Sequence, residues 1–134
     1  MVDMSCTLVH HGHIRLLKKA AQYGQVVVAL TTDEEIFLNK GYWPELNFEH
    51  RSEIIAAVRY VHEVVPSKWL LTNDFLIANS IDVLIHGDDN SNQIDCCDLK
   101  IFPRTEGISS SDLRRLSYEI YTGRNVERGL GKER

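Results

Sequence analysis

The chain has 134 residues, which suits one domain around a single hydrophobic core. Its net charge of -4 at pH 7 argues against a general nucleic-acid binder, because binding a phosphate backbone needs a surplus of Lys and Arg. No apolar run approaches the roughly 20 residues of a membrane helix, and the first residues lack the pattern of a signal peptide. The three cysteines, two of them adjacent, favour free thiols in a reducing compartment. We therefore expect a cytoplasmic protein with no nucleic-acid or membrane partner.

The spacing of apolar residues predicts strands and helices that follow one another along the chain. In chain order, we predict a strand at 2–6, a helix at 12–23, a strand at 25–30, a long loop at 31–47, a helix at 48–61, a strand at 62–65, a helix at 73–79, strands at 82–86 and 99–102, and a helix at 110–121. Gly24 is a natural end for the first helix, and Pro66 is expected to end the third strand. Ser109 or Ser110 caps the last helix.

Strands that alternate with helices predict a Rossmann-like α/β fold, in which a parallel sheet carries helices on both faces. We expect one domain over residues 1–122 and a polar C-terminal tail over 123–134. Ligands of such sheets bind beyond the carboxyl ends of the strands. Four polar segments follow predicted strands, so we expect them to lie together at that edge. They are residues 10–13, 31–40, 87–89 and 104–110.

Two of these segments carry residue types that bind phosphate. His10-His11-Gly12-His13 places two imidazoles just before a predicted helix. The downstream segment 104–110 combines an arginine, small hydroxyls and a glycine at the start of the last helix. A helix N-terminus offers free backbone N–H groups and the positive end of the helix dipole. Two anion-binding elements in one small chain indicate a nucleoside triphosphate site. A zinc site is a weaker reading, since three histidines within four residues cannot all face one ion.

Taken in order, these motifs resemble the cytidylyltransferase branch of the nucleotidyltransferase superfamily, as in glycerol-3-phosphate cytidylyltransferases. The segment 10–13 matches the HxGH signature of that family, and 104–110 matches its RTEGISTT signature. Residues 48–51 and 59–64 match its middle helix and the following strand, and 87–89 match its GDD turn. The resemblance implies the HxGH nucleotidyltransferase fold.

The chain departs from the family pattern at several positions. Relatives usually carry Gly-Thr-Phe-Asp before the HxGH signature, whereas this chain has residues 4–7, Met-Ser-Cys-Thr. Thr7 therefore removes a carboxylate from the phosphate or metal side of the site. His62 stands where relatives commonly carry Asp, and Asn90 stands where many carry Trp. These changes concern the acceptor more than the nucleotide.

The implied reaction is attack by a phosphate or phosphonate oxygen on the α-phosphorus of CTP, with release of pyrophosphate. The resemblance implies Mg²⁺ as cofactor, held mainly by phosphate and water, with no metal-ligating protein residue expected. It implies a homodimer and CDP-activated precursors for cell-surface polymers. Glycerol 3-phosphate is the default acceptor. An aminoalkyl phosphonate or phosphoglutamine is an alternative.

The resemblance also implies roles for individual residues. The catalytic residues are His10, His13, Lys40 and Arg104. The nucleotide-binding residues are Ser5, Cys6, Thr7, Gly12, Gly87, Asp88, Thr105, Gly107, Ile108, Ser109 and Ser110. The acceptor-binding residues are Lys40 and Arg59.

Plainer readings of several of these residues stay open. Lys40 could be a solvated loop lysine, and Arg104 could form a structural salt bridge. Asp88 could serve only to form a turn. Arg59 could pair with Glu63 at a helix end. Arg51 favours a structural role.

Two other functions stay open at the level of sequence. One is an adenylyltransferase of the same superfamily, because nucleotide choice depends on a base pocket that the sequence does not define. The other is a non-catalytic nucleotide-binding regulatory protein that lost activity with the missing acidic residue.

Overall fold

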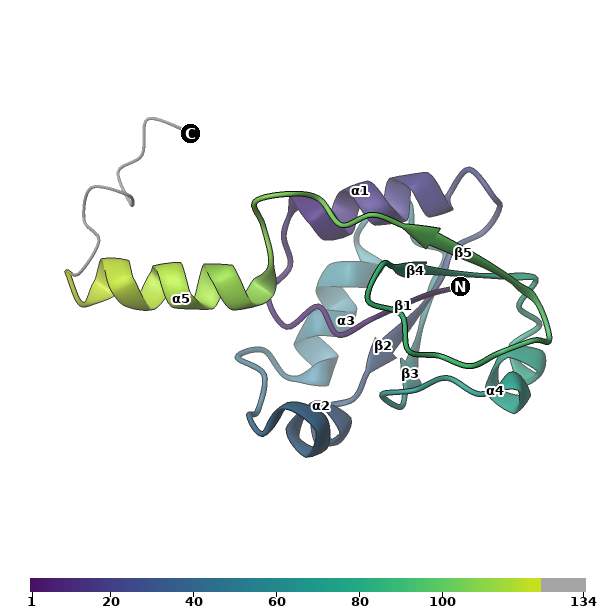
Figure 1. Cartoon of the computed structure of the whole chain (residues 1–134), viewed down its shortest axis with the longest axis horizontal. Helices are drawn as coiled ribbons and strands as arrows, with labels where there is room; N and C mark the ends of the chain where they lie inside the picture. Colours follow the sequence, from purple (N-terminus) through teal and green to yellow (C-terminus); the bar gives the residue numbers. More distant parts are fainter. Residues whose placement is uncertain (124–134) are drawn as a thin grey trace.

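Five parallel strands form one sheet in the order β3-β2-β1-β4-β5. The computed structural model describes residues 1–123 (Figure 1). The strands are β1 (Val2–Met4), β2 (Val27–Thr31), β3 (Glu63–Ser67), β4 (Val83–Gly87) and β5 (Asp98–Phe102). Val2 of the central strand is in register with Val28 on one side and Ile85 on the other. The predicted parallel sheet is confirmed.

Helices cover both faces of this sheet. They are α1 (His11–Ala20), α2 (Asp33–Lys40), α3 (Phe48–Ala56), α4 (Asn73–Ala78) and α5 (Ser110–Tyr121). Leu17 of α1 and Ile55 of α3 pack on Val28 in one buried cluster. Leu76 of α4 packs with Leu84 in a second cluster. Because alternate residues of a strand point to opposite faces, the two clusters lie on the two sides of the sheet. The Rossmann-like arrangement predicted from the sequence is therefore confirmed.

The prediction of a loop over 31–47 is wrong in part, because the helix α2 lies within that segment. Thr32 caps the helix by accepting a hydrogen bond from the Glu35 N–H, and Gly41 ends it at φ 78°. Ile36 is the one residue of α2 that is fully buried. A mostly exposed helix needs few apolar positions, so it leaves little hydrophobic periodicity. The cap, the acidic first turn and the final glycine were the available signals.

Strand β3 runs through Pro66 instead of ending before it. Pro66 is in register with Leu30 of β2, and the strand continues to Ser67. A proline lacks the N–H that a residue of an inner strand donates to one of its two neighbouring strands. Because β3 is an edge strand of the sheet, the missing donor costs little there.

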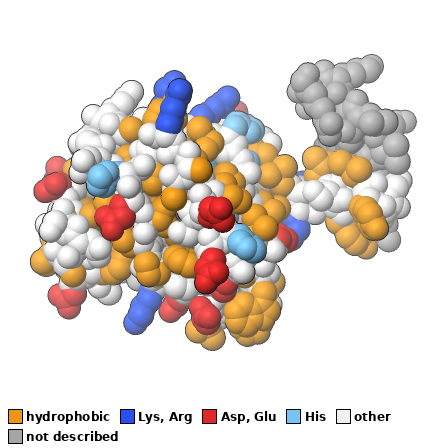
Figure 2. All heavy atoms as spheres, turned by 180° about the vertical axis from the view of Figure 1, so that it is seen from behind, with side chains coloured by type: hydrophobic (Ala, Val, Ile, Leu, Met, Phe, Trp, Pro, Cys, Tyr) orange, Lys and Arg blue, Asp and Glu red, His pale blue; other side chains and the backbone are white. Residues whose placement is uncertain are grey.

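Helix α5 extends away from the sheet (Figure 1), and none of its residues is fully buried. Its bounds and its cap, Ser109, match the prediction from the sequence. Figure 2 shows apolar side chains on the exposed surface of this helix. Tyr118, Ile120 and Tyr121 are exposed hydrophobic residues of α5. The predicted tail at 123–134 lies outside the described residues except for Gly123. Within residues 1–123, no helix combines the length and apolar character needed to cross a bilayer.

Candidate active site

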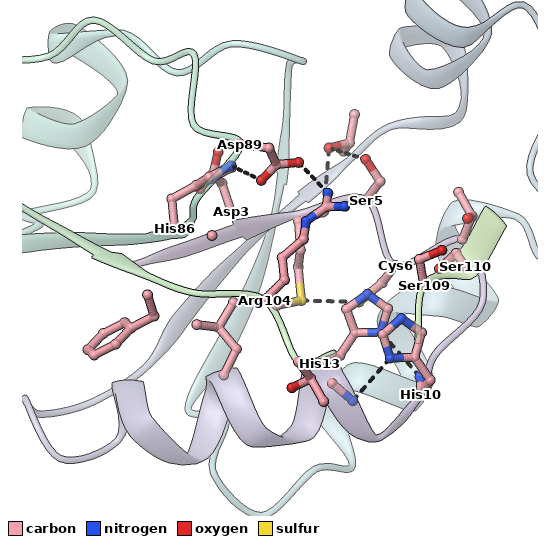
Figure 3. A pocket seen from close by; sticks show the side chains of 18 of the residues that line it. Asp3, Ser5, Cys6, His10, His13, His86, Asp89, Arg104, Ser109 and Ser110 are labelled. Atoms are coloured by element: carbon pink, nitrogen blue, oxygen red, sulfur yellow. Dashed lines mark hydrogen bonds and ion pairs between the residues drawn. The ribbon is translucent and has the colours of Figure 1, made fainter. Parts of the chain in front are cut away.

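A pocket of about 460 Å³ opens at the carboxyl ends of the strands (Figure 3). Its wall combines the loop after β1, the first turn of α1, the end of β4 and the segment that joins β5 to α5. The sequence predicted this meeting of segments, because parallel strands bring their carboxyl ends to one edge. The predicted site residues that line the pocket are Ser5, Cys6, Thr7, His10, Gly12, His13, Lys40, Gly87, Arg104, Thr105, Ile108, Ser109 and Ser110.

His10 and His13 cap α1 with their own side chains. The Gly12 N–H donates to Nδ1 of His10 at 3.0 Å, and the His10 N–H donates to Nδ1 of His13 at 3.2 Å. The two rings stack with centroids 3.8 Å apart. A neutral imidazole whose Nδ1 accepts a hydrogen bond carries its proton on Nε2. The caps therefore leave each histidine with an Nε2–H donor at the pocket.

Both imidazoles favour the neutral form. Burial lowers the pKa of His13 to about 3, helped by the neighbouring His10 and the Arg104 guanidinium. Burial also lowers the pKa of His10, with smaller contributions from His11 and Arg104. These side chains therefore act as hydrogen-bond donors near neutral pH and not as cations. His11 is exposed and lies outside the pocket wall.

Gly12 is required by packing against the first histidine. A Cβ atom at this position would lie 2.8 Å from Cε1 of His10 and 3.4 Å from Cγ2 of Ile108. A side chain would therefore push the His10 ring out of its capping position. Gly12 is a predicted nucleotide contact, and the structure adds this steric reason for glycine.

The N-terminus of α5 lies beside the histidine motif and lines the same pocket (Figure 3). Ser109 caps it by accepting from the Asp112 N–H at 3.0 Å. The Ser110 hydroxyl donates to the Leu8 carbonyl at 2.9 Å and accepts from the Leu8 N–H at 3.4 Å. Ser110 thus ties the start of α5 to the loop that precedes the histidines. Gly107 is not in the pocket wall; it forms the turn before α5 at φ 77°.

Arg104 lines the pocket and also forms salt bridges. Its Nη2 donates to Oδ2 of Asp89, and its Nε lies 3.8 Å from Oδ1 of Asp88. The guanidinium is largely exposed, so it can still turn toward a ligand. The predicted nucleotide residue Asp88 is outside the pocket wall, and Asp89 lies in it. Of the two carboxylates in this turn, the one that lines the pocket is therefore one residue later than predicted.

Lys40 lies at the end of α2, with its ammonium 5.6 Å from the centre of the Trp69 ring. Both residues line the pocket. Cys6 is buried with φ 48°, and burial raises the pKa of its thiol. A thiol held in the neutral form is a poor nucleophile, which suits a shaping role for Cys6 in the pocket wall.

Arg59 does not reach the pocket, contrary to the prediction that it binds the acceptor. It follows α3, where it is exposed and donates to the Tyr60 hydroxyl at 2.9 Å. His62 lies beside the N-terminal end of β3, where its N–H donates to the Val26 carbonyl. The chain therefore places both residues at the edge of the sheet opposite the pocket. The structure shows the predicted structural role for Arg51, whose buried guanidinium donates to Asp33 and to the carbonyls of Ser5, Thr31 and Leu46.

Thr7, which replaces the usual acidic residue, accepts a hydrogen bond from Nη2 of Arg114 at 3.2 Å. Glu45 binds the same guanidinium at 2.8 Å. The Glu45 hydrogen bond and charge raise the pKa of Arg114. Glu45 therefore supplies Arg114 with a carboxylate partner that Thr7 cannot.

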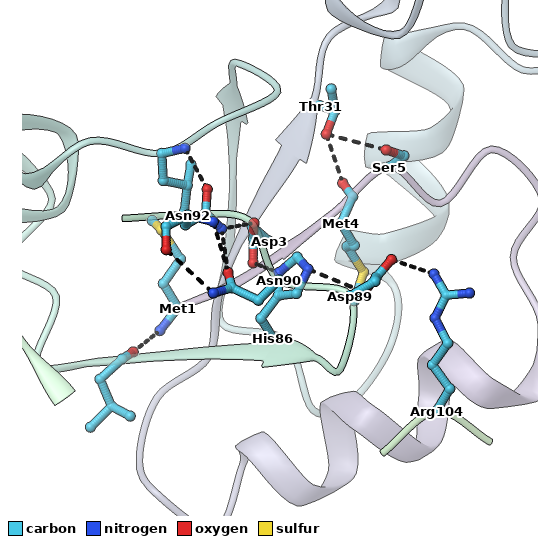
Figure 4. A network of polar contacts seen from close by, with 12 residues as sticks. Met1, Asp3, Met4, Ser5, Thr31, His86, Asp89, Asn90, Asn92 and Arg104 are labelled. Carbon is cyan, nitrogen blue, oxygen red and sulfur yellow. Dashed lines mark hydrogen bonds and ion pairs between the residues drawn. The ribbon is translucent and has the colours of Figure 1, made fainter. Parts of the chain in front are cut away.

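The floor of the pocket holds a group of polar residues that the sequence did not predict as a unit (Figure 4). It consists of Asp3, His86, Asp89 and Asn92, all in the pocket wall. Asp3 and His86 are polar residues within otherwise apolar strands, at positions close to the carboxyl ends. That placement was the signal available in the sequence, because a polar residue there faces the ligand site of a parallel sheet.

The geometry defines a class before any comparison is made. A Rossmann-like sheet brings two neutral imidazole donors, a helix N-terminus and two cationic side chains to one pocket. Such an arrangement is that of an α/β protein that binds the phosphates of a nucleotide.

Comparison with known proteins agrees with this class. The family model described as cytidylyltransferase-like matches residues 7–116. The chain is 38% identical over 112 residues to the glycerol-3-phosphate cytidylyltransferase of Bacillus subtilis (strain 168), covering 80% of this chain and 87% of that protein. It is 33% identical over 124 residues to the ethanolamine-phosphate cytidylyltransferase of Dictyostelium discoideum, covering 84% of this chain and 34% of that longer protein.

Among solved structures, the lipopolysaccharide core biosynthesis protein of Thermoplasma volcanium GSS1 has the same fold. The TM-score is 0.63 at 20% identity, over 78% of this chain and 93% of that one. The chain belongs to the cytidylyltransferase-like family. It is a CTP-dependent nucleotidyltransferase, which sets aside the adenylyltransferase and non-catalytic alternatives.

Proposed function

We propose that this chain transfers CMP from CTP to a small phosphorylated acceptor, with glycerol 3-phosphate as the first candidate, and releases pyrophosphate. The support from relatives is the identity of 38% to the Bacillus subtilis enzyme, whose name gives that acceptor. The support from the structure is the pocket at the carboxyl ends of the strands. The observation that carries the proposal is the pair of Nε2–H donors on His10 and His13, which line the same pocket as the N-terminus of α5.

The chemistry needs charge stabilisation more than a base. The attacking phosphate oxygen of the acceptor is already anionic, so no side chain has to remove a proton. The bond from that oxygen to the α-phosphorus forms as the bond to pyrophosphate breaks, and negative charge shifts onto the leaving oxygen. Fixed donors that meet this charge lower the barrier, because they are oriented before the reaction begins. His10 and His13 have this property, since the caps hold both rings.

Cationic and hydroxyl groups complete the proposed phosphate site. Arg104 can donate two parallel hydrogen bonds to phosphate oxygens, which a lysine cannot do. Thr105, Ser109 and Ser110 contribute from the start of α5. Lys40 reaches the pocket from the side of Trp69, which suits contact with the acceptor phosphate.

We also propose Mg²⁺ as cofactor. Within residues 1–123, no three His, Cys, Asp or Glu side chains are grouped as metal ligands. The carboxylates in the pocket wall, Asp3 and Asp89, are already paired with His86 and Arg104. Since both carboxylates already have partners, the pocket wall fits an ion that takes most of its ligands from phosphates and water. Bound Mg²⁺ would neutralise part of the charge on the triphosphate and on the departing pyrophosphate.

A second acceptor candidate is ethanolamine phosphate or an aminoalkyl phosphonate. The pocket wall beside Lys40 holds the Trp69 ring. A substrate ammonium can bind the face of such a ring. Relatives named ethanolamine-phosphate cytidylyltransferase share 32–35% identity with this chain.

A panel of acceptors with CTP and Mg²⁺ tests the proposal. Glycerol 3-phosphate, ethanolamine phosphate, 2-aminoethylphosphonate and phosphoglutamine are each supplied, and both pyrophosphate and the CDP-linked product are measured. Glycerol 3-phosphate should give the highest kcat/KM, with CTP preferred over ATP. Product from another acceptor alone would reassign the substrate. No product from any of them would reject the proposal.

We propose a homodimer and a role in making CDP-activated precursors of cell-surface polymers as further parts of this function. The exposed apolar side chains of α5 support a contact beyond the single chain, because Tyr121 is 92% exposed. Light scattering of the purified protein measures the oligomeric state. A monomer at working concentration would reject the dimer.

A further inference from the structure

A chain of four charged or ionisable side chains crosses the pocket floor (Figure 4). Asp3 lies in β1, His86 in β4, Asp89 in the loop after β4, and Arg104 after β5. Nδ1 of His86 hydrogen-bonds Oδ1 of Asp3, and its Nε2 lies 3.4 Å from Oδ1 of Asp89. The other carboxylate oxygen of Asp89 accepts from Nη2 of Arg104. Asp89 is therefore shared between an imidazole and a guanidinium.

The His86 ring is held from behind by buried groups. The Asp3 side chain is 8% exposed, and its Oδ2 accepts from Nδ2 of Asn92 at 2.9 Å. Oδ1 of Asn92 accepts from the Leu71 N–H at 2.8 Å. Asp3 thus has fixed partners on both oxygens, and Nδ1 of His86 is committed to it. The other ring nitrogen, Nε2, then faces Asp89.

Arg104 has two competing uses in this arrangement. Its guanidinium lines the pocket where we place the triphosphate, yet Asp89 occupies it. A phosphate that takes the edge of the guanidinium now bound to Asp89 must displace that carboxylate. An anionic Asp89 that loses Arg104 beside a triphosphate is unfavourable unless another cation takes it. His86 is the residue in the described structure that already contacts Asp89 on its other oxygen.

We propose that His86 is a positioning residue for nucleotide binding, which takes the Asp89 carboxylate so that Arg104 can turn to the triphosphate. The inference rests on the proposed nucleotide site but not on the identity of the acceptor. His86 does not touch the substrate in this role. It acts through Asp89, and Asp3 and Asn92 keep its ring in place.

The groups that face His86 make its charge dependent on pH. They are Asp3 from β1 and Asp89 from the following loop, with Arg104 and Asp88 beyond Asp89. Burial alone would lower the pKa of His86, but the hydrogen bond and charge of Asp3, with those of Asp89, raise it above its ordinary value. Protonated His86 attracts Asp89 and neutral His86 does so weakly. CTP affinity should therefore fall as the pH rises through the pKa of His86.

Calorimetric titration with CTP and Mg²⁺, without acceptor, tests the proposal. His86→Gln should weaken CTP binding by about fivefold or more, since directly coupled residues commonly interact on this scale. Asp89→Asn should bind CTP as well as the wild type or more tightly, because Arg104 is no longer occupied. The double variant should bind like Asp89→Asn alone. His62→Gln is the matched control, since that imidazole is exposed at the other edge of the sheet.

The double variant separates this role from a structural one. Equal CTP affinity of His86→Gln and wild type would overturn the proposal, as would a full loss on His86→Gln that persists with Asp89→Asn. Should His86→Gln fail to fold, the variant Asp89→Asn still tests the proposal, because Asp89 is exposed. Its Asn variant should lose the decline of CTP affinity with rising pH, and an unchanged decline overturns the proposal. If CTP binds but no acceptor reacts, the proposed function fails alone.

Discussion

Nδ1 of His13 accepts a hydrogen bond from the backbone N–H of His10 at 3.2 Å, while Nδ1 of His10 accepts from the Gly12 N–H. One short motif therefore satisfies two free N–H groups at the start of α1 and also sets the tautomer of both rings. The same geometry that caps the start of the helix leaves Nε2–H on each imidazole for a phosphate. Stability and catalysis are coupled at these two residues, and variants at them should show both effects.

Replacing His13 by Ala should lower kcat by about 10²–10³, the usual effect of removing one fixed donor from a developing oxyanion. The variant also loses part of the cap of α1, which should lower the free energy of unfolding by about 0.5–2 kcal/mol. Steady-state kinetics at saturating CTP and urea unfolding measure the two effects. His11→Ala is the control, because His11 is exposed outside the pocket wall and should leave both values unchanged. Turnover close to that of wild type in His13→Ala would remove His13 from the mechanism.

Ser110→Ala should have a milder effect on kcat than His13→Ala. The Ser110 hydroxyl forms hydrogen bonds with the N–H and the carbonyl of Leu8. Its loss therefore removes a connection between α5 and the loop that precedes His10. Other donors at the helix N-terminus remain, so we expect kcat to fall by about tenfold or less. The free energy of unfolding should fall by about 1 kcal/mol, the net contribution of a typical hydrogen bond. Ser117→Ala, on an exposed position of α5, is the control. A larger loss of kcat in Ser110→Ala than in His13→Ala would contradict this ranking.

Arg51→Met should destabilise the fold by about 3–5 kcal/mol, the cost of breaking a buried ion pair by removing one partner. The Arg51 side chain is fully buried and bonds Asp33 at 2.6 Å. Its loss leaves Asp33 without that partner and removes donors from three carbonyls. Denaturant unfolding of Arg51→Met and Arg59→Met makes the comparison, because Arg59 is exposed. Similar small losses in both variants would show that burial of Arg51 contributes little.

The free energy of unfolding should decrease as the pH falls from about 6.5 towards 3, because of His13. Burial lowers the pKa of His13 to about 3 in the folded protein, against 6.5 in the unfolded chain. Between these values the unfolded chain binds a proton that the folded protein does not, so acid favours unfolding. One such group contributes a slope of up to about 1.4 kcal/mol per pH unit. His13→Gln should flatten the pH dependence measured by chemical unfolding. An identical slope in wild type and variant would mean that other groups cause it.

Local patterns in the sequence predicted most of the fold. Apolar runs and caps located every strand and four of the five helices, because secondary structure depends on the periodicity of neighbouring residues. The exposed helix α2 was missed, since it buries little and so carries little periodicity. The predicted third strand ended too early, before Pro66. Only the order of strands shows that β3 lies at an edge, where a proline is tolerated.

The site was predicted in the same way, where it is local. The segments 10–13 and 104–110 each begin a helix, so their residues and spacing are enough to indicate phosphate binding. Pairs between distant segments were beyond such reasoning. Asp3 and His86 are 83 residues apart and meet because β1 and β4 are neighbours in the sheet. Arg59 was expected near the acceptor, and the chain direction into β3 places it at the other edge of the sheet.

The sequence by itself determined the alternation of strands and helices, the two phosphate-binding segments and the family resemblance. All three depend on residues close together in the chain. The tertiary structure decided which carboxylate faces Arg104, which nitrogen of each imidazole is free, and which residues share the pocket floor. Those features depend on strand order and side-chain packing, which join residues that the chain keeps far apart.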